Sequence, residues 1–207
     1  ASSAPGAVVA IKNSTLNGLC TVNVASAGAN VTVDGSTVNC NDNNTTEGES
    51  YAALCLNKEA VGGSIIATNS TINVTEGSDS NAGRNGAEDG VITINGGVEG
   101  VVVTKAVITY PGSDYYYGFE TIEEAVEFAK GENEISLIRN VELTESTTVA
   151  AGKTITLDLN GKTITGIDSS TGSFGLITNK GNLTVKNGTI TLKAENNRYW
   201  NFYSSVI

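Results

Sequence analysis

An eight-residue pattern of apolar and polar positions recurs along the chain. In LTVKNGTI (183–190), positions one, three and eight are aliphatic and position five is Asn. Five earlier segments follow a closely similar pattern: VAIKNSTL (9–16), VTVDGSTV (31–38), IIATNSTI (65–72), VVVTKAVI (101–108) and LDLNGKTI (157–164). Positions one and eight are aliphatic in every copy, and position five is Asn or Gly except at Lys105. We call this segment the repeat phrase, and its recurrence predicts one local structure used several times.

Each repeat phrase combines two short strands with an interruption. Before the interruption, positions one and three lie on one side of a strand, because side chains alternate along it. The Asn-Gly pair at 187–188 then breaks the alternation, and Ile190 resumes an apolar face. Two structures fit this pattern. One is a β-hairpin with an Asn-Gly turn, and the other is a bend at a left-handed Asn or Gly that keeps the apolar side inward.

The order of the copies favours the bend. The copies run in one direction and begin at residues 9, 31, 65, 101, 157 and 183. Further short apolar stretches precede most of them: TVNV (21–24), ALCL (53–56), VITI (91–94) and GLIT (175–178). Stacked coils accept insertions of different length as loops while their strands stay in register. The sequence therefore predicts an all-β chain folded as a parallel β-helix solenoid.

One segment, FETIEEAVEFAKG (119–131), has helical periodicity. Small and apolar residues recur there at helical spacing, namely at Ile122, Ala125, Val126 and Ala129. Thr121 and Glu124 carry the signature of a capping box, and Gly131 is a typical helix stop. An open solenoid end exposes core side chains and unpaired backbone. We therefore predict a short amphipathic capping helix near 121–130 that covers the first coil after it.

A linker is expected just before that helix. The segment TYPGSDYYYG (109–118) contains a Pro and two Gly residues, which favour irregular structure. The sequence thus predicts two parts: residues 1–113 form the coils of one module, and residues 114–207 form the helix-capped start of a second set of coils.

The second part resembles a known family. GFETIEEAVEFAKGENEISLIRNVEL and the following GKTITLDLNGKTIT resemble the opening of pectate-lyase-like right-handed parallel β-helix domains. Domains of this kind are repeated in large surface proteins of gut bacteria that are described as adhesins. The resemblance extends over 118–192 and is only generic over 1–108. It implies right-handed coils and a role in cell adhesion, although this fold specifies function weakly.

Composition and charge narrow the classes of partner. The net charge is −10, and only 12 Lys and Arg residues could neutralise phosphates, so we expect no nucleic-acid partner. No apolar run approaches the roughly 20 residues of a membrane helix, so we expect no membrane insertion. The chain contains no Met, and we therefore expect a processed protein or a segment of a longer one.

The three cysteines, Cys20, Cys40 and Cys55, leave two readings open. They lack the CxxC spacing typical of zinc sites, so no metal is expected there. They fit either buried free thiols or a Cys20–Cys40 disulfide between neighbouring repeats.

Residues suited to catalysis are sparse. The chain has no His, and its Arg residues stand in unrelated segments, at Arg84, Arg139 and Arg198. Acidic residues gather around 42–49 and 76–89, but neither stretch has the alternating spacing of a calcium loop. The sequence therefore predicts no catalytic residues, no metal and no cofactor.

Aromatic side chains are the candidate ligand-binding residues. They form two clusters, one with Tyr115, Tyr116 and Tyr117 and the other with Tyr199 and Trp200. Aromatic rings stack on sugars and anchor protein contacts, but they also pack long loops. The two clusters therefore fit either a ligand-binding or a packing role.

These observations favour a non-catalytic extracellular β-helix module, a stalk or adhesive part of a bacterial surface protein with a host glycan or surface protein as partner. A polysaccharide-active or glycan-binding domain is the alternative. A third reading is a filament subunit, because NFYSSVI (201–207) resembles the first strand of a coil that a neighbouring chain could complete head to tail.

Overall fold

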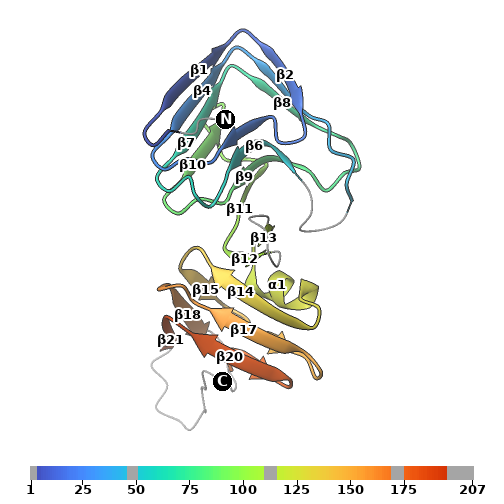
Figure 1. The fold of residues 1–207 in the computed structure, drawn as a ribbon, viewed down its shortest axis with the longest axis vertical. Helices are drawn as coiled ribbons and strands as arrows, with labels where there is room; N and C mark the ends of the chain where they lie inside the picture. The colour runs from blue at the N-terminus through green and yellow to red at the C-terminus, as the bar shows by residue number, and fades with distance from the viewer. Residues whose placement is uncertain (1–3, 46–50, 110–115, 169–174, 195–207) are drawn as a thin grey trace. The chain divides into compact units, whose positions relative to one another are not determined.

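The computed structural model describes residues 4–45, 51–109, 116–168 and 175–194 (Figure 1). The chain divides into two compact units, Ala1–Thr104 (unit 1) and Lys105–Ile207 (unit 2). This division precedes the predicted boundary at residue 113, because β12 (Ala106–Thr109) pairs with strands of unit 2. Most strands in both units pair in parallel.

The described residues of unit 1 form three parallel sheets, and the chain passes through them in turn. The first sheet holds β1 (Val8–Lys12), β4 (Asn30–Asp34), β7 (Ser64–Thr68) and β10 (Val91–Ile94), in that order. The second holds β2 (Thr15–Gly18), β5 (Thr37–Cys40) and β8 (Thr71–Val74). The third holds β3 (Val22–Val24), β6 (Ala52–Leu56), β9 (Asn81–Asn85) and β11 (Val101–Val103). This order is consistent with a parallel β-helix.

The bends in the repeat phrase have the predicted conformation. Asn13, Gly35 and Asn69 follow strands of the first sheet with φ of 46°, 58° and 49°. Asn tolerates this left-handed region better than other residues with a side chain, and Gly tolerates it without steric conflict. Aliphatic residues before and after each bend therefore both face inward, as the buried Val33 and Val38 show.

The fourth copy of the repeat phrase (101–108) does not form such a bend. Its first half is β11 of unit 1, and its second half is β12 of unit 2. The structural equivalent is VITIN (91–95), where β10 pairs with β7 and Asn95 has a φ of 49°. The assignment of 101–108 as a coil was therefore wrong, and Lys105 in place of Asn or Gly was the sign of it.

Unit 2 also contains parallel sheets, but its first strands pair in an antiparallel manner. Its largest sheet has the order β13 (Tyr116–Phe119), β12, β14 (Glu132–Leu137), β17 (Thr154–Asp158) and β20 (Asn182–Lys186). Two further parallel sheets hold β15 (Val141–Leu143), β18 (Thr163–Asp168) and β21 (Thr189–Ala194), and β16 (Thr147–Val149) with β19 (Ile177–Asn179). β12 runs antiparallel to both β13 and β14. The parallel stack thus begins at β14.

The predicted helix is present as α1 (Ile122–Phe128), slightly shorter than 121–130. Thr121 and Glu124 form both halves of the capping box. Ile122 and Val126 are buried in the core of unit 2 and face a group of coil residues that includes Leu143, Val149, Ile155, Leu157, Ile164 and Ile177. The prediction that the helix packs over the coil core is confirmed.

Aliphatic residues of the stacked coils in unit 2 form inward rows. Ile155, Leu157, Leu159 and Ile164 are at most 2% exposed. In the next coil, Leu183, Val185 and Ile190 are half-buried and pack against the same core. They align with the buried rows through the pairs Ile155–Leu183, Leu157–Val185 and Ile164–Ile190.

The cysteine pairing differs from both sequence readings. Cys20 is bonded to Cys55, with 6.4 Å between their Cα atoms, and Cys40 is a buried free thiol. The strand that follows Cys20, β3, pairs with β6, which carries Cys55. Cys40 lies in a different sheet, and its thiol donates a hydrogen bond to the carbonyl of Leu19. A Cys20–Cys40 disulfide was therefore the wrong pairing.

Candidate functional site

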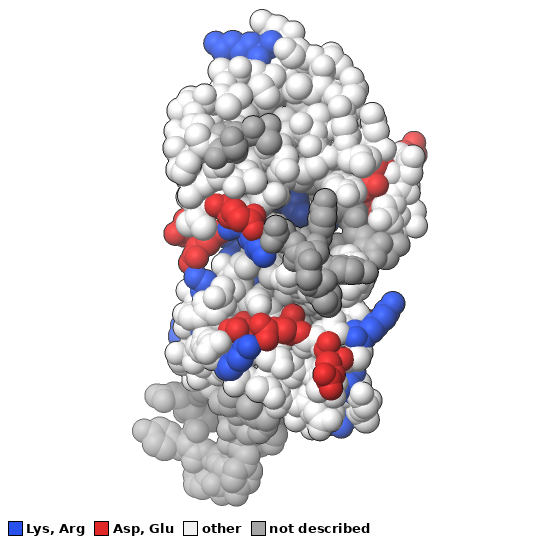
Figure 2. Space-filling model, viewed as in Figure 1, with Lys and Arg blue, Asp and Glu red and all other residues white. Residues whose placement is uncertain are grey.

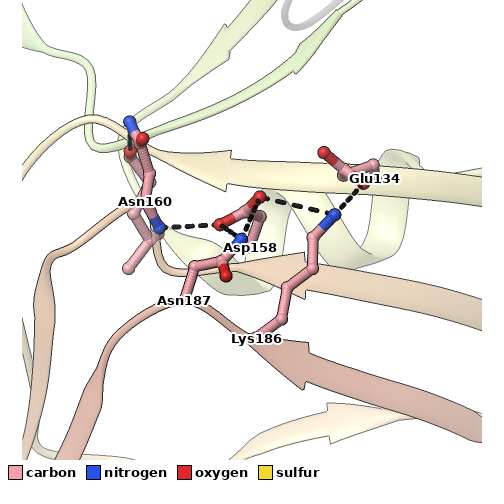
Figure 3. A network of polar contacts seen from close by, with 6 residues as sticks. Glu134, Asp158, Asn160, Lys186 and Asn187 are labelled. Atoms are coloured by element: carbon pink, nitrogen blue, oxygen red, sulfur yellow. Dashed lines mark hydrogen bonds and ion pairs between the residues drawn. The ribbon is translucent and has the colours of Figure 1, made fainter.

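The outward face of β14, β17 and β20 carries a group of interacting charges and amides (Figure 3). Asp158 on β17 and Lys186 on β20 occupy paired positions, and Glu134 lies on β14. Their side chains point outward because their neighbours in each strand, such as Leu157, point into the core. We call Glu134, Asp158, Asn160, Lys186 and Asn187 the Lys186 cluster.

The ammonium group of Lys186 bridges two carboxylates from two other strands. Its Nζ lies 2.7 Å from Oε2 of Glu134 and 3.4 Å from Oδ2 of Asp158. The amide of Asn187 donates to both carboxylate oxygens of Asp158, at 3.2 and 3.1 Å. One side chain of β17 is thus tied to two consecutive residues of the next coil.

Asn160 connects the same cluster to the preceding coil. Its backbone N–H donates to Oδ1 of Asp158 at 2.8 Å, and its side-chain amide donates to the carbonyl of Leu137 at 3.1 Å. Asn160 and Asn187 both have left-handed backbones, with φ of 49° and 58°. The bend residues of the repeat phrase therefore also act as hydrogen-bonding links between coils.

The electrostatic environment fixes the charges in this cluster. For Asp158, burial would raise the pKa, but hydrogen bonds from Asn160, Asn187 and Lys186 outweigh it and hold the pKa below its usual value. The hydrogen bond to Glu134 is the main reason that the pKa of Lys186 lies above its usual value, and burial opposes it only in part. Both groups remain charged near neutral pH.

This arrangement disfavours acid–base catalysis. A general acid or base works best when its pKa lies near the working pH, and both shifts move away from neutrality. Glycoside hydrolysis by a carboxyl pair needs one protonated member, whereas the lowered pKa of Asp158 favours its anion. The cluster is suited to joining coils.

Unit 1 has a comparable ladder that sequence reasoning missed. The N–H of Ser14 donates to Oγ of Ser36, the N–H of Ser36 donates to Oγ of Ser70, and the N–H of Ser70 donates to Oδ1 of Asn95, each at 3.1 Å. Ser36 and Ser70 are buried. Position six of the repeat phrase is Ser in the first three copies, which was the available signal.

A second row in unit 1 is exposed. The amide of Asn39 donates to Oδ1 of Asn17 at 2.7 Å, and the amide of Asn73 donates to Oδ1 of Asn39 at 2.8 Å. These residues occupy matching positions on β2, β5 and β8. The paired threonines Thr15, Thr37 and Thr71 form a parallel row on the same face. Hydroxyl and amide groups therefore stand in two matching rows on this outer face.

The acidic stretch around 42–49 contains a buried residue. Asp42 is 5% exposed and accepts hydrogen bonds from the N–H groups of Asn44 and Tyr51 and the hydroxyl of Ser80. Burial opposes ionisation, but these hydrogen bonds outweigh it and lower the pKa of Asp42. Asp42 thus anchors the chain after β5. Among the described residues, no three His, Cys, Asp or Glu side chains gather as a metal site would require.

Two of the predicted ligand-binding aromatics lie in β13. Tyr116 and Tyr117 are half-buried, and the ring of Tyr117 stacks at an angle on Phe128 of α1 with centroids 4.8 Å apart. Tyr117 therefore packs the capping helix. Tyr115, Tyr199 and Trp200 lie outside the described residues, so a ligand-binding role for the aromatic clusters stays a prediction.

Charge is dispersed on the face drawn in Figure 2, where Lys, Arg, Asp and Glu stand in small groups separated by uncharged surface. In the described part of the chain, no helix has the length and apolar character needed to cross a membrane.

Comparison of the chain with protein-family models, with curated proteins and with solved structures found no significant match.

Proposed function

We propose that the chain is a non-catalytic stalk or adhesion module of an extracellular bacterial surface protein. Its stacked parallel sheets would then form a right-handed parallel β-helix of the pectate-lyase-like type. In such a module the coils keep a defined spacing and present one repeated outer surface to a host glycan or a surface protein.

The Lys186 cluster is the observation that carries this proposal. Its ammonium, carboxylate and amides contact one another across three strands, and the pKa shifts of Asp158 and Lys186 lead away from proton transfer near neutral pH. Hydrogen bonds to charged groups are stronger than those between neutral groups, although water weakens them at an exposed surface. Such links resist the separation of coils, as a stalk requires.

The Cys20–Cys55 disulfide supports an extracellular location. It joins the turn before β3 to β6 in the next coil. Disulfides persist in secreted and surface proteins and are rare in reducing compartments.

An assay for polysaccharide cleavage tests the proposal that the module is not catalytic. The purified chain, incubated with acidic and neutral polysaccharides, should release no reducing ends and no unsaturated uronic acids. Asp158→Asn is the matched variant, because it removes the carboxylate and keeps the shape. Product release by the parent that is lost in Asp158→Asn would overturn the proposal.

Protease treatment of intact cells that express the chain tests its extracellular location. Peptides of the chain should be released before those of any cytoplasmic marker protein.

Glycan binding is a second candidate, favoured by the exposed amide row. Each side-chain amide has two N–H bonds, and the contacts within the row use one of those on Asn39 and one on Asn73. Hydroxyl-rich sugars could bind to the remaining donors. On a glycan array, Asn39→Ala should weaken binding about tenfold, the effect of losing roughly one or two hydrogen bonds. Thr32→Ala, on the outward face of β4, is the control and should bind as the parent does.

A further inference from the structure

The first coil of unit 1 has an open edge within the described residues. β1 and β2 stand at the end of their sheets, each paired on one side only, with β4 and β5. Val9, Ile11 and Leu16 point toward the core but remain half-buried. An apolar strand edge of this kind is a template for pairing with another chain.

The backbone of β1 shows which groups face that edge. The carbonyl of Ala7 accepts from Asn30, and the N–H of Asn13 donates to Asp34, so the odd-numbered residues hydrogen-bond toward β4. Because the N–H and C=O groups of successive residues point to opposite edges of a strand, Val8, Ala10 and Lys12 direct theirs toward the open edge.

β20 of unit 2 offers the complementary edge. Among the described residues, it is the last strand of its sheet and pairs with β17 alone. The N–H of Asn182 donates to Lys153, and the carbonyl of Lys186 accepts from Leu159, so the even-numbered residues bond toward β17. Leu183 and Val185 therefore direct their backbone groups to the free edge, and their side chains are half-buried.

The two edges carry the same repeat phrase, VAIKNSTL and LTVKNGTI. If β1 of one chain lies beside β20 of another as β20 lies beside β17, Asn182 comes opposite Val8. In that register Leu183 lies over Val9, Val185 lies over Ile11 and Ile190 lies over Leu16. The left-handed Asn187 then matches the left-handed Asn13, so both bends turn together.

Unit 2 shows what closes a coil end. Before its first parallel strand, β14, the antiparallel β12 occupies the strand edge and α1 covers the core. Nothing in the described part of unit 1 takes these roles beside β1.

We propose that the chain binds a second copy of itself, with β20–β21 of one copy stacked in parallel register on β1–β2 of the next. The contact joins two different surfaces, so each bound copy still offers a free edge and assembly continues beyond a dimer. This self-association goes beyond the proposed function and does not depend on it.

One charge pair opposes the contact and supplies a test. The register places Lys12 opposite Lys186, and like charges on facing strand positions are destabilising. Lys12→Gln removes the repulsion, places no second carboxylate opposite Asp34 and leaves the backbone edge intact. It should lower the concentration at which the chain assembles, most clearly at low salt.

Ala10→Pro tests the backbone contact directly. Its side chain is exposed and its N–H points away from β4, so proline removes an edge donor and keeps every bond to β4. Ala10→Thr is the matched control, because it keeps the N–H. Sedimentation velocity over a wide concentration range should show growing oligomers for the parent and for Ala10→Thr. For Ala10→Pro the concentration at which assembly begins should rise about tenfold or more, the effect of one lost hydrogen bond plus a steric block.

Mixing the parent with Ala10→Pro tests whether assembly is head to tail. Ala10→Pro keeps β20 intact, so a small fraction of it added to the parent should add to one end, stop growth there and shorten the oligomers. A parent chain that stays monomeric at every concentration would overturn the proposal. So would an Ala10→Pro variant that is folded by circular dichroism and assembles as the parent does. Should Ala10→Pro fail to fold, a Lys12→Gln variant that assembles no better than the parent overturns it.

Discussion

Replacing Lys153 with Met should loosen the capping helix of unit 2. The Nζ atom of Lys153 donates to the carbonyls of Val126, Glu127 and Ala129, at 2.6, 2.8 and 2.9 Å. These are carbonyls at the end of α1, where the helix provides no N–H partners of its own. The last turn of α1 contains no basic residue, so Lys153 supplies the cation that the negative end of a helix favours.

The expected loss is about 2–3 kcal/mol of unfolding free energy. A hydrogen bond to a charged group contributes about 1.5–3 kcal/mol, and a cation at a helix C-terminus contributes about 0.3–1 kcal/mol. Because the three contacts share one half-buried ammonium group, we count the free energy of only one charged hydrogen bond. To this we add part of the free energy of the charge–dipole interaction. Met keeps the apolar stem and removes only the charge and the donors.

Two measurements check this value. Urea unfolding of unit 2 should shift its midpoint by roughly 1–2 M at an ordinary m-value. Amide hydrogen exchange over 122–129 should accelerate, because the helix opens more often. Lys180→Met is the matched control, since Lys180 is exposed in a turn and the substitution is the same. If Lys153→Met and Lys180→Met unfold within about 0.5 kcal/mol of each other, the contact contributes nothing and the reasoning is refuted.

Four further predictions concern both units. Leu157→Asp should unfold unit 2, because an unpaired charge at a 2%-exposed core position costs several kcal/mol, whereas the outward Thr156→Asp should be tolerated. Stability should fall as acid protonates Asp158: its folded pKa is lowered, so its contribution is complete above the unfolded pKa near 4 and is lost below it. A flatter stability curve below that pH for Asp158→Asn would confirm the assignment. Peptide mapping should find Cys20 bonded to Cys55, and reduction should remove about 3–4 kcal/mol from unit 1, with a Cys20–Cys40 peptide as the contrary result. Gly188→Ala should destabilise unit 2 by about 1–3 kcal/mol, because its Cβ would meet Leu159 and lie 2.5 Å from the carbonyl of Lys162, whereas Gly97→Ala meets only a carbonyl at 3.7 Å.

The repeat phrase predicted local structure well where the backbone itself limits the choice. Left-handed bends at Asn13, Asn69 and Asn187 followed from residue type, because few other side chains tolerate that region. The inward position of Leu157 followed from strand alternation, and the capping box at Thr121 followed from side-chain reach. Each of these features depends on neighbours within a few residues.

The features that depend on distant neighbours were not predictable. β9 reads NAGRN and shows no apolar alternation, yet it pairs between β6 and β11. Its Asn85 is buried because its side chain donates to the carbonyl of Gly90 and accepts from the N–H of Ala87. The partner of Cys20 was set by which strand stacks beside β3. The contact of Lys153 with α1 could not be predicted, because it depends on the end of the helix lying beside the turn before β17.

In the candidate site, too, local features could be predicted and contacts between distant residues could not. Asp158 and Lys186 occupy paired strand positions, although Asp158 is position two of its copy of the repeat phrase and Lys186 is position four of the next. Their contact, together with Glu134, depends on in-register stacking of three strands, which the phrase alone does not specify. The strongest sequence signal for a ligand site, the tyrosine cluster, contributes Tyr117 to helix packing.

Copies of the repeat phrase stack on one another because their contacting positions are interchangeable. Aliphatic residues occupy positions one and eight in every copy, and a left-handed residue follows the first strand in each copy that forms a coil. Such similar surfaces discriminate poorly between one copy and another. The segments that cover the ends of the stack therefore determine which strand edges can pair. In unit 2, β12 and α1 supply that cover with residues outside the repeat pattern. Specificity in a chain of this type therefore lies in its caps, and changes to α1 or to β1 should alter assembly more than equal changes within the stacked coils.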